Sequence, residues 1–367
     1  MNHHMINSLK HGSTIGILGG GQLGRMLAVA ASKLGFKTHI YEPEKNPPAS
    51  QVANKVTTAA YEDTNALITF ANEVDVITFE FENIPETALN TLETIRKVLP
   101  ARNALVTSQD RIIEKKFLEE LGLKVAPYAN INTQSDLLSA LATVGAPSIM
   151  KTRRFGYDGK GQVRLKEVDC GNIAWEELGK TPCVLEGLIN FEKEISVIGA
   201  RNQSGEVVCF DPGENTHKDG ILHTTNVPAG ITTSQRMDAV LLTGKILNAL
   251  NYVGVMGIEL FVMSDELLIN EIAPRVHNSG HWTQNGCVID QFEQHIRAIS
   301  GWHLGDGKRH SNVLMTNLIG TDALDIDTLS KDTSIGIHLY GKEIVKSGRK
   351  MGHINTILVN ILFAFAL

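Results

Sequence analysis

The sequence predicts an α/β protein whose N-terminal part is an open, parallel sheet of the Rossmann-like kind. Short apolar runs at 14–18, 37–41 and 74–79 have the continuous hydrophobicity of strands that are covered on both faces. The first run leads through a glycine turn at 19–24 into a helical segment at 25–34. Strand, glycine turn, helix and strand in this order are typical of a nucleotide-binding sheet.

Length and composition limit the classes of protein to consider. At 367 residues the chain is long enough for two or three domains. Its net charge of -6 gives no global basic field, so nucleic acid and anionic membrane are not expected partners. The 4 cysteines form no Cys-x-x-Cys pair, which argues against a zinc site and fits a reducing cytoplasm. Residues 1–12 lack the apolar segment of a secretory signal and are expected to be a loose extension.

The turn at 19–24 satisfies the Gly-x-Gly-x-x-Gly pattern, and Glu42 follows about 20 residues later. Taken alone, this pattern predicts a dinucleotide site. The helix N-terminus after the turn would also accept other phosphates or a carboxylate, so the ligand stays open. Glu80 and Glu82 follow the strand at 74–79, at the edge where parallel sheets bind ligands. They are site candidates, and a polar turn is the alternative.

A strand at 148–151 continues into a glycine-rich and cationic segment at 152–162. This composition makes a poor strand and a good phosphate-binding loop, with Lys151 at its base. The alternative is an exposed glycine-rich hairpin. The chain has no Gly-x4-Gly-Lys-Ser/Thr motif, so it is not a P-loop enzyme.

Residues 257–272 indicate two apolar strands joined by a tight turn. If the hairpin is symmetric about Asp265, Glu259 and Glu271 lie opposite each other, about 5 Å apart at Cβ. Two like charges destabilise a sheet unless a divalent cation binds between them, so the pair predicts a magnesium site. A solvated hairpin end is the alternative. Asn270 could add an amide oxygen to this site, although strict strand alternation would turn it to the opposite face.

The segment directly after this hairpin carries Arg275, His277, Asn278 and His281. A single histidine is usually structural. Two histidines and an arginine beside an acidic pair favour a place in the same site.

Several separated motifs resemble one family of enzymes. Lys151, the loop at 156–162, Glu186, Glu194 and the glutamates of the hairpin are similar to the ATP-grasp fold. Further motifs resemble the N5-carboxyaminoimidazole ribonucleotide synthetase family, over about residues 13–355. These motifs are Gly19–Met26, Phe79–Ile84, His217–Leu222, Ala273–Gln284 and Gly348–Asn355.

The resemblance implies an ATP-grasp fold between a parallel-sheet N-terminal domain and a small β-rich C-terminal domain. The implied limits are 1–12 for the extension, then 13–112, 113–302 and 303–367 for the three domains. The family pattern ends near 355, where a polar stretch is expected and an apolar run at 356–367 is found. That run is shorter than the roughly 20 residues of a membrane span. It indicates a buried terminal element or an altered C-terminal domain.

The resemblance also implies the reaction. A member of the family phosphorylates bicarbonate with ATP, and carboxyphosphate, or CO2 released from it, carboxylates the exocyclic amine of 5-aminoimidazole ribonucleotide in purine biosynthesis. The implied enzyme is a ligase that uses ATP and Mg2+, with Mn2+ as an alternative. It is expected to be a cytoplasmic homodimer that acts on small molecules, without nucleic acid or membrane.

The resemblance assigns residues to each ligand. It assigns to ATP Arg111, Lys151, Gly156, Tyr157, Asp158, Gly159, Lys160, Gly161, Gln162, Glu186, Gly187, Leu188, Ile189, Glu194, His217, Asn270 and Glu271. It assigns Glu259 and Glu271 to the metal, and Arg275, His277 and Asn278 to catalysis near bicarbonate. It assigns to the sugar phosphate Gln22, Leu23, Glu80, Arg349 and Lys350.

Three other functions compete with this interpretation. A dehydrogenase would use the turn at 19–24 but leaves the segment 151–162 and the paired glutamates unexplained. Another ATP-grasp ligase, such as a formate-dependent glycinamide ribonucleotide transformylase, would differ in its substrates. A nucleotide-binding protein without catalysis would bind ATP and not turn it over.

Overall fold

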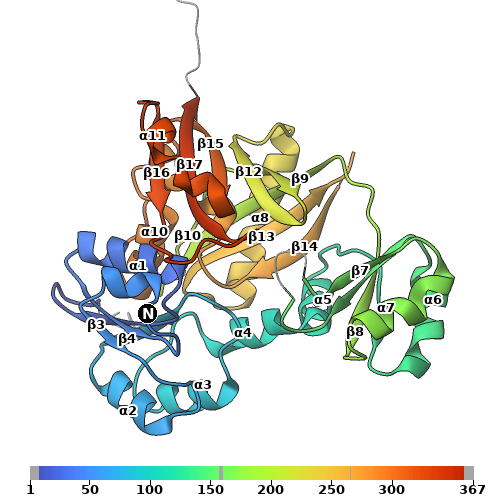
Figure 1. Ribbon diagram of the computed structural model, residues 1–367, viewed down its shortest axis with the longest axis horizontal. Coiled ribbons are helices and arrows are strands. Elements are labelled where there is room, and N and C mark those ends of the chain that lie inside the picture. The colour runs from blue at the N-terminus through green and yellow to red at the C-terminus, as the bar shows by residue number, and fades with distance from the viewer. Residues whose placement is uncertain (1–7, 157–159, 265, 359–367) are drawn as a thin grey trace, which may run out of the picture.

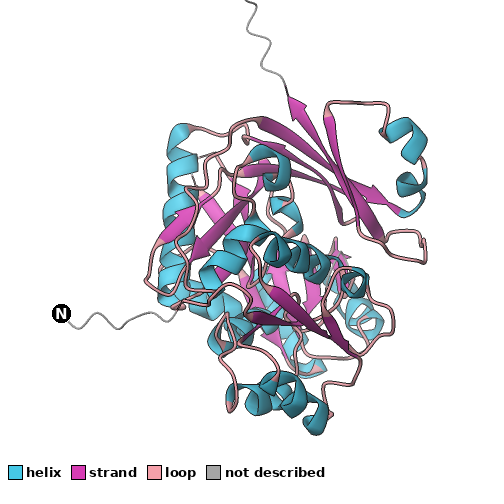
Figure 2. Ribbon diagram, turned by 90° about the vertical axis from the view of Figure 1, so that its left-hand side faces the viewer, coloured by secondary structure: helices cyan, strands magenta, loops and turns pink. Residues whose placement is uncertain are grey.

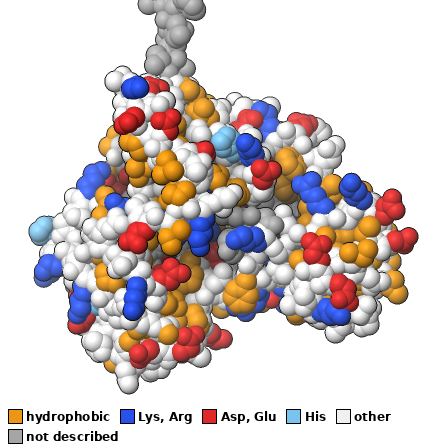
Figure 3. All heavy atoms as spheres, in the orientation of Figure 1, with side chains coloured by type: hydrophobic (Ala, Val, Ile, Leu, Met, Phe, Trp, Pro, Cys, Tyr) orange, Lys and Arg blue, Asp and Glu red, His pale blue; other side chains and the backbone are white. Residues whose placement is uncertain are grey.

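Figure 1 shows a computed structural model with a large body and a smaller domain at its side. The structure describes residues 8–156, 160–264 and 266–358. The small domain, residues 128–187, lies beyond helix α5 from the body in this view. Figure 3 shows acidic and basic side chains interspersed over the face in view, as expected for a chain with a modest net charge.

The N-terminal domain is built on a four-stranded parallel sheet of order β3-β2-β1-β4. The strands are β1 (Thr14–Leu18), β2 (Lys37–Tyr41), β3 (Lys55–Thr57) and β4 (Val76–Phe79). The helices of this domain are α1 (Gln22–Lys33), α2 (Thr64–Asn72) and α3 (Glu86–Glu93), with η1 (Pro48–Gln51). The predicted parallel sheet is confirmed, and α1 begins three residues earlier than the sequence predicts.

The small domain is an antiparallel sheet of order β5-β8-β6-β7 with two helices packed on it. Its strands are β5 (Tyr128–Ile131), β6 (Ser148–Thr152), β7 (Gln162–Leu165) and β8 (Cys183–Gly187). Its helices are η2 (Gln134–Asp136), α6 (Leu137–Val144), η3 (Val168–Cys170) and α7 (Gly171–Glu177). Trp175, Leu141 and Met150 form part of a hydrophobic core that this domain has to itself.

The central sheet contains nine strands, in the order β14-β13-β9-β11-β12-β15-β17-β16, and β10 pairs with β9. The strands are β9 (Lys193–Arg201), β10 (Val207–Cys209), β11 (Gly213–Lys218), β12 (Ile221–Val227), β13 (Gly254–Val262), β14 (Leu267–Ala273), β15 (Asn312–Ile319), β16 (Ile335–Leu339) and β17 (Lys350–Leu358). All the neighbouring pairs are antiparallel. The β-rich C-terminal part therefore continues the central sheet through the β12–β15 pair, and Figure 2 shows these strands at the top of the molecule.

Helices surround the central sheet and connect it to its neighbours. They are α4 (Arg102–Gln109), α5 (Arg111–Glu120), α8 (Thr233–Ala249), η4 (Asn278–Gly280), α9 (Thr283–Gly286), α10 (Gln291–Ile299), η5 (Gly320–Leu324) and α11 (Ile326–Leu329). Helix α5 begins after Asp110, whose carboxylate accepts a hydrogen bond from the Ile112 amide at 2.9 Å. Helix α8 begins with a capping box between Thr232 and Gln235.

The structure tests some parts of the predicted domain organisation and leaves others as predictions. The predicted parallel-sheet domain and β-rich C-terminal strands are confirmed, whereas the domain limits at 112 and 302 stay predictions. Residues 356–358 of the apolar run belong to β17, and the remainder of that run lies outside the described residues. Within the described part of the chain, no helix is long and apolar enough to cross a membrane.

A buried histidine joins the N-terminal domain to the central sheet. The Nε2 atom of His295, in α10, lies 2.8 Å from the hydroxyl of Thr78 in β4. Its Nδ1 atom accepts a hydrogen bond from the Val255 amide in β13 at 3.1 Å. Because Nδ1 accepts, Nε2 carries the proton and donates it to Thr78, so this joint requires a neutral imidazole. Burial lowers the pKa of His295 to about 3, which keeps the ring neutral.

We expect this histidine to make stability depend on pH. In the unfolded chain the pKa of His295 is about 6.5, so below that pH the unfolded chain takes up a proton that the folded chain refuses until about pH 3. Between pH 7 and 5 this lowers the free energy of unfolding by about 2 kcal/mol. Glutamine can also donate and accept, so His295→Gln should remove that part of the pH dependence.

The measurement is urea unfolding of the wild type and the variant at pH 7 and pH 5. His303→Gln, at an exposed histidine, is the matched control and should keep the slope of the wild type. Equal slopes for the wild type and His295→Gln would contradict the assignment.

Candidate active site

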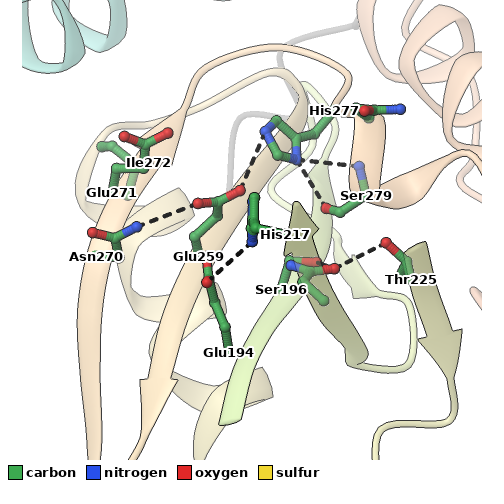
Figure 4. A network of polar contacts seen from close by, with 12 residues as sticks. Glu194, Ser196, His217, Thr225, Glu259, Asn270, Glu271, Ile272, His277 and Ser279 are labelled. Carbon is green, nitrogen blue, oxygen red and sulfur yellow. Dashed lines mark hydrogen bonds and ion pairs between the residues drawn. The ribbon is translucent and has the colours of Figure 1, made fainter. Parts of the chain in front are cut away.

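The β13–β14 hairpin places two glutamates opposite each other. Glu259 is paired with Glu271 in the register of the two strands, as the sequence predicts. A register shift follows directly after Glu259, however, and it turns Asn270 toward this carboxylate. The amide nitrogen of Asn270 lies 3.3 Å from Glu259 Oε2 (Figure 4). Strict strand alternation therefore fails at Asn270, because a bulge interrupts it.

The Glu259 carboxylate lies among other ionisable groups. His277 Nε2 is 3.7 Å from Glu259 Oε1, and one ligand atom each of Glu194, His217 and Glu259 lie within 4.8 Å of one another. Figure 4 shows Glu259 between His277 on one side and the Glu194–His217 pair on the other. Burial, followed by the charges of Glu271 and Glu194, raises the pKa of Glu259 to about 8.

A second buried carboxylate lies beside Glu271. Glu114, on α5, accepts a hydrogen bond from the Ile272 amide at 2.7 Å, and burial and the charge of Glu271 raise its pKa to about 8. Arg111 pairs with Glu271 at 3.2 Å, which compensates part of this charge. Hard oxygen ligands with an excess of negative charge fit a divalent cation such as Mg2+. The residues present therefore fit the metal site that the sequence predicts.

Opposite these acids, Glu186 holds two lysines together. Lys151 Nζ lies 2.9 Å and Lys115 Nζ 3.2 Å from the two oxygens of the Glu186 carboxylate. Burial alone would raise the pKa of Glu186, but the two ammonium groups outweigh it and hold the pKa at about 2. Sequence reasoning missed Lys115, although it lies four residues after Arg111 and therefore on the same face of α5.

The glycine-rich segment begins where β6 ends. The Thr152 amide donates to Gly161 O at 2.8 Å, and a Cβ at Gly161 would lie 2.7 Å from the Thr152 hydroxyl. Gly161 also has a φ of 70°, so both space and backbone conformation favour glycine there. Gly156, Lys160 and Gln162 belong to this segment. The predicted ATP contacts Tyr157, Asp158 and Gly159 lie outside the described residues.

Gly187, Leu188 and Ile189 lead from β8 of the small domain to β9 of the central sheet. The Gly187 amide donates to Pro127 O at 2.8 Å and the Leu188 amide to Pro147 O at 3.1 Å. These bonds fix the connection between the two sheets close to the Glu186 carboxylate.

The glycine turn of the N-terminal domain is already filled by side chains of the chain itself. The Gly20 amide donates to Glu42 Oε2 at 2.7 Å, and the Gly21 and Gly24 amides donate to the two oxygens of Glu80. A pyrophosphate would need these same donors. The dinucleotide interpretation is therefore wrong for this turn, and Glu80 instead shapes the start of α1.

The residues predicted for the sugar phosphate come together from opposite ends of the chain. Lys342 Nζ donates to Gln22 Oε1 and to Lys350 O, both at 2.6 Å. Leu23 packs on the hydrophobic core below, and Arg349 donates to Ile344 O at 3.1 Å. Sequence reasoning missed Lys342, because its partner Gln22 is 320 residues away along the chain.

Arg275 and His277 follow strand β14 and contact glutamates of the N-terminal domain and of the hairpin, respectively. Arg275 pairs with Glu82 at 2.6 Å, and although burial opposes it, this carboxylate raises the pKa of Arg275. His277 Nδ1 lies 2.8 Å from the Ser279 hydroxyl, and burial lowers the pKa of His277, which keeps the ring neutral. The charges of Arg275 and Lys350 lower the pKa of His277 further.

Asn278 and His281 are engaged in packing. Asn278 exchanges two amide hydrogen bonds with Asn317 of β15, at 2.9 and 2.8 Å. The His281 ring stacks on His353 of β17, with 4.6 Å between ring centroids. These contacts hold the segment after β14 to the C-terminal strands, and a direct contact of Asn278 with bicarbonate stays a prediction.

Three domain families match consecutive parts of the chain. The ribonucleotide synthetase preATP-grasp domain matches residues 12–109, the ATP-grasp domain 116–292, and the phosphoribosylaminoimidazole carboxylase C-terminal domain 313–361.

Whole proteins and solved structures are similar along nearly the full length. An N5-carboxyaminoimidazole ribonucleotide synthase of Brucella melitensis is 51% identical over 355 residues, which are 95% of this chain and 98% of that protein. The crystal structure of an N5-carboxyaminoimidazole ribonucleotide synthetase with ADP has a TM-score of 0.94 at 42% identity, covering 97% of this chain and 95% of the other. The enzyme from Aspergillus clavatus with ADP and 5-aminoimidazole ribonucleotide has a TM-score of 0.89 at 30% identity, covering 95% and 94%. The chain therefore belongs to the N5-carboxyaminoimidazole ribonucleotide synthetase family of ATP-grasp enzymes.

Proposed function

We propose that the chain carboxylates 5-aminoimidazole ribonucleotide with bicarbonate and ATP, giving N5-carboxyaminoimidazole ribonucleotide, ADP and phosphate. The observation that carries this proposal is the half-buried Arg275–Glu82 pair, two residues before His277, whose Nε2 atom lies 3.7 Å from the Glu259 carboxylate. It supplies a fixed cation for a small oxyanion between the acids of the hairpin and the residues that gather around Gln22. The similar enzymes with ADP and with the ribonucleotide support the same assignment.

ATP would lie between the small domain and the central sheet. Lys151, Lys115 and Arg111 would offer positive charge to its phosphates, with Glu186 holding the two lysines in place. Glu194, on the central sheet, would accept hydrogen bonds from the ribose. The Nδ1 atom of His217 lies 3.2 Å from Glu194 Oε2. The glycine-rich segment would cover the phosphates with its backbone amides.

Glu259 and Glu271 would hold Mg2+, with Mn2+ as an alternative. When bound, the metal would supply charge neutralisation at the transferred phosphate. The support in this chain is that Glu259 faces Glu271 across the hairpin, and that burial, followed by the charge of Glu271, raises the pKa of Glu259 and of Glu114 to about 8.

The acceptor reaction then uses the residues after β14. A bicarbonate oxygen attacks the γ-phosphorus, the bond to the ADP oxygen breaks, and carboxyphosphate forms. The exocyclic amine attacks its carbonyl carbon, or CO2 released from it, and phosphate leaves while the amine loses a proton. Arg275 would stabilise the negative charge of both steps, and the neutral His277 would orient bicarbonate by hydrogen bonding rather than by charge.

The proposal extends to substrate binding, assembly and location. Gln22, Leu23 and Glu80 would form one wall of the ribonucleotide site, and Arg349 and Lys350 the other. We propose domain limits at 112 and 302, a homodimer, and a place in the cytoplasm. The free cysteines of the described residues agree with a reducing compartment.

The test of the reaction omits or replaces one substrate at a time. With ATP, Mg2+, labelled bicarbonate and 5-aminoimidazole ribonucleotide, the protein should release ADP in step with label entering an acid-labile carbamate. Replacing bicarbonate with formate should abolish the product. Formate-dependent formylation would instead indicate a transformylase, and ATP binding without turnover would indicate a non-catalytic nucleotide-binding protein.

A second prediction concerns the metal. Glu271→Gln keeps the shape of the side chain but removes an anionic oxygen, so ADP release should fall by about a hundredfold. The matched control is Glu266→Gln, at an exposed glutamate on the same hairpin that pairs with Lys124. The control should keep the activity of the wild type. Near-normal turnover of Glu271→Gln at low Mg2+ would refute the metal assignment.

A third prediction separates the two substrate sites. Lys350→Ala or Arg349→Ala should raise the KM for the ribonucleotide by about tenfold or more and change the KM for ATP little, because a charged hydrogen bond to phosphate is lost. Lys346→Ala is the control, since Lys346 is exposed on the same connection. An effect confined to ATP would move Arg349 and Lys350 to the nucleotide site.

A further inference from the structure

Three consecutive side chains, where α4 ends and α5 begins, contact three different parts of the proposed active site. They belong to Gln109, Asp110 and Arg111, which we call the junction. Figure 1 shows α4 and α5 between the N-terminal domain and the small domain. The junction therefore lies where the nucleotide side and the acceptor side of the site meet.

Asp110 fixes the base of the glycine-rich segment. Arg153 Nε lies 3.1 Å from each Asp110 oxygen, and Nη2 lies 2.6 Å from Oδ2. The Arg111 amide also donates to Arg153 O at 3.1 Å. A bidentate pair of this kind, together with a backbone bond, leaves the end of β6 little freedom relative to α5.

Gln109 connects the next residue of the same segment to the acceptor side. Its Oε1 atom accepts from Arg154 Nη2 at 2.9 Å. Its Nε2 atom donates to Glu82 O at 2.6 Å and to Ile84 O at 3.2 Å. The Glu82 carboxylate in turn holds Arg275 through two contacts, at 2.6 and 3.3 Å.

The chemistry of this position requires an amide. One side must accept from a guanidinium, and the other must donate to two backbone carbonyls. Glutamine does both with a single planar group, whereas glutamate lacks the donor and methionine lacks both. Arg111, two residues on, contacts Glu271 of the metal-binding hairpin, so the junction touches all three functional parts.

We propose that Gln109 is a positioning residue that couples phosphoryl transfer to carboxylation, by holding the Glu82–Arg275 pair in register with the glycine-rich segment. This inference rests on the proposed function. With Gln109 in place, Arg275 is in position when ATP is in its site. Without it, bicarbonate is still phosphorylated, but carboxyphosphate is lost to water, whose oxygen takes the place of the amine as nucleophile.

The experiment measures two products of the same reaction. For Gln109→Met, the ratio of ADP released to labelled carbamate formed should rise about fivefold or more, because each lost hydrogen bond corresponds to about fivefold and this variant loses three. The KM for ATP should stay within about twofold. Gln134→Met is the matched control, since Gln134 is exposed on the small domain and its side chain donates to Asn172 at 3.3 Å. The control should keep the ratio near that of the wild type.

A second variant keeps the proposal testable if Gln109→Met does not fold. Arg154→Met removes the other partner of the same bond and should raise the ratio as well. The ratio of the double variant should not exceed that of the more affected single variant, because both changes break the same Gln109–Arg154 connection. A purely structural effect would lower ADP and carbamate together and leave the ratio unchanged.

The outcomes separate this inference from the proposed function. A wild-type protein that forms no carbamate would overturn the function itself. A wild-type protein that forms one carbamate for each ADP, together with unchanged ratios in the folded single variants, would overturn the inference alone.

Discussion

The accumulation of buried carboxylate charge at the β13–β14 hairpin is the constraint on which the rest of the site depends. Burial, followed by the charge of Glu271, raises the pKa of Glu259 and of Glu114 to about 8. A sheet with these residues alone would be destabilised by repulsion and desolvation. The fold compensates part of the charge with Arg111, and a ligand that carries positive charge would compensate the remainder. Binding of such a ligand would therefore stabilise the folded chain as well as prepare the reaction.

At the other end of the site, positive charge is in excess and one carboxylate holds it together. Lys115 and Lys151 would repel each other if they were alone, but Glu186 lies between them and stays ionised, with a pKa of about 2. One fixed negative charge thus leaves a net positive charge at that end of the site. Helix α5 contributes to both groups, since Arg111 faces the hairpin and Lys115 faces Glu186. A helix at this position sets the distance between the acids and the cations, which a triphosphate with a metal would span.

Local patterns predicted much of this arrangement, and long-range contacts account for what they missed. The predicted pairing of Glu259 with Glu271 is confirmed, but the turn alone does not set it. The strands leave the turn with Val262 opposite Leu267, and the register shift after Glu259 moves the pairing by one residue and brings Glu271 opposite Glu259. Alternation alone left the side of Asn270 open, since a bulge depends on the packing of both strands and leaves no mark in the spacing. Lys115 and Lys342 escaped notice because their partners lie far away along the chain. The merging of the C-terminal strands into the central sheet rests on the β12–β15 pair, which is also non-local.

The glycine turn of the first domain shows how the surroundings decide the chemistry of a motif. Its spacing suits a pyrophosphate, yet Glu42 and Glu80 have taken the amides that would bind one. Gly19 has a φ of 98°, and a Cβ there would lie 2.4 Å from the Glu80 side chain, so the glycine serves the approach of this carboxylate. With its donors occupied, the turn fixes the first turn of α1 and hence Gln22, which meets Lys342 from the C-terminal strands. The same backbone that binds a phosphate in a dinucleotide fold therefore holds two carboxylates here.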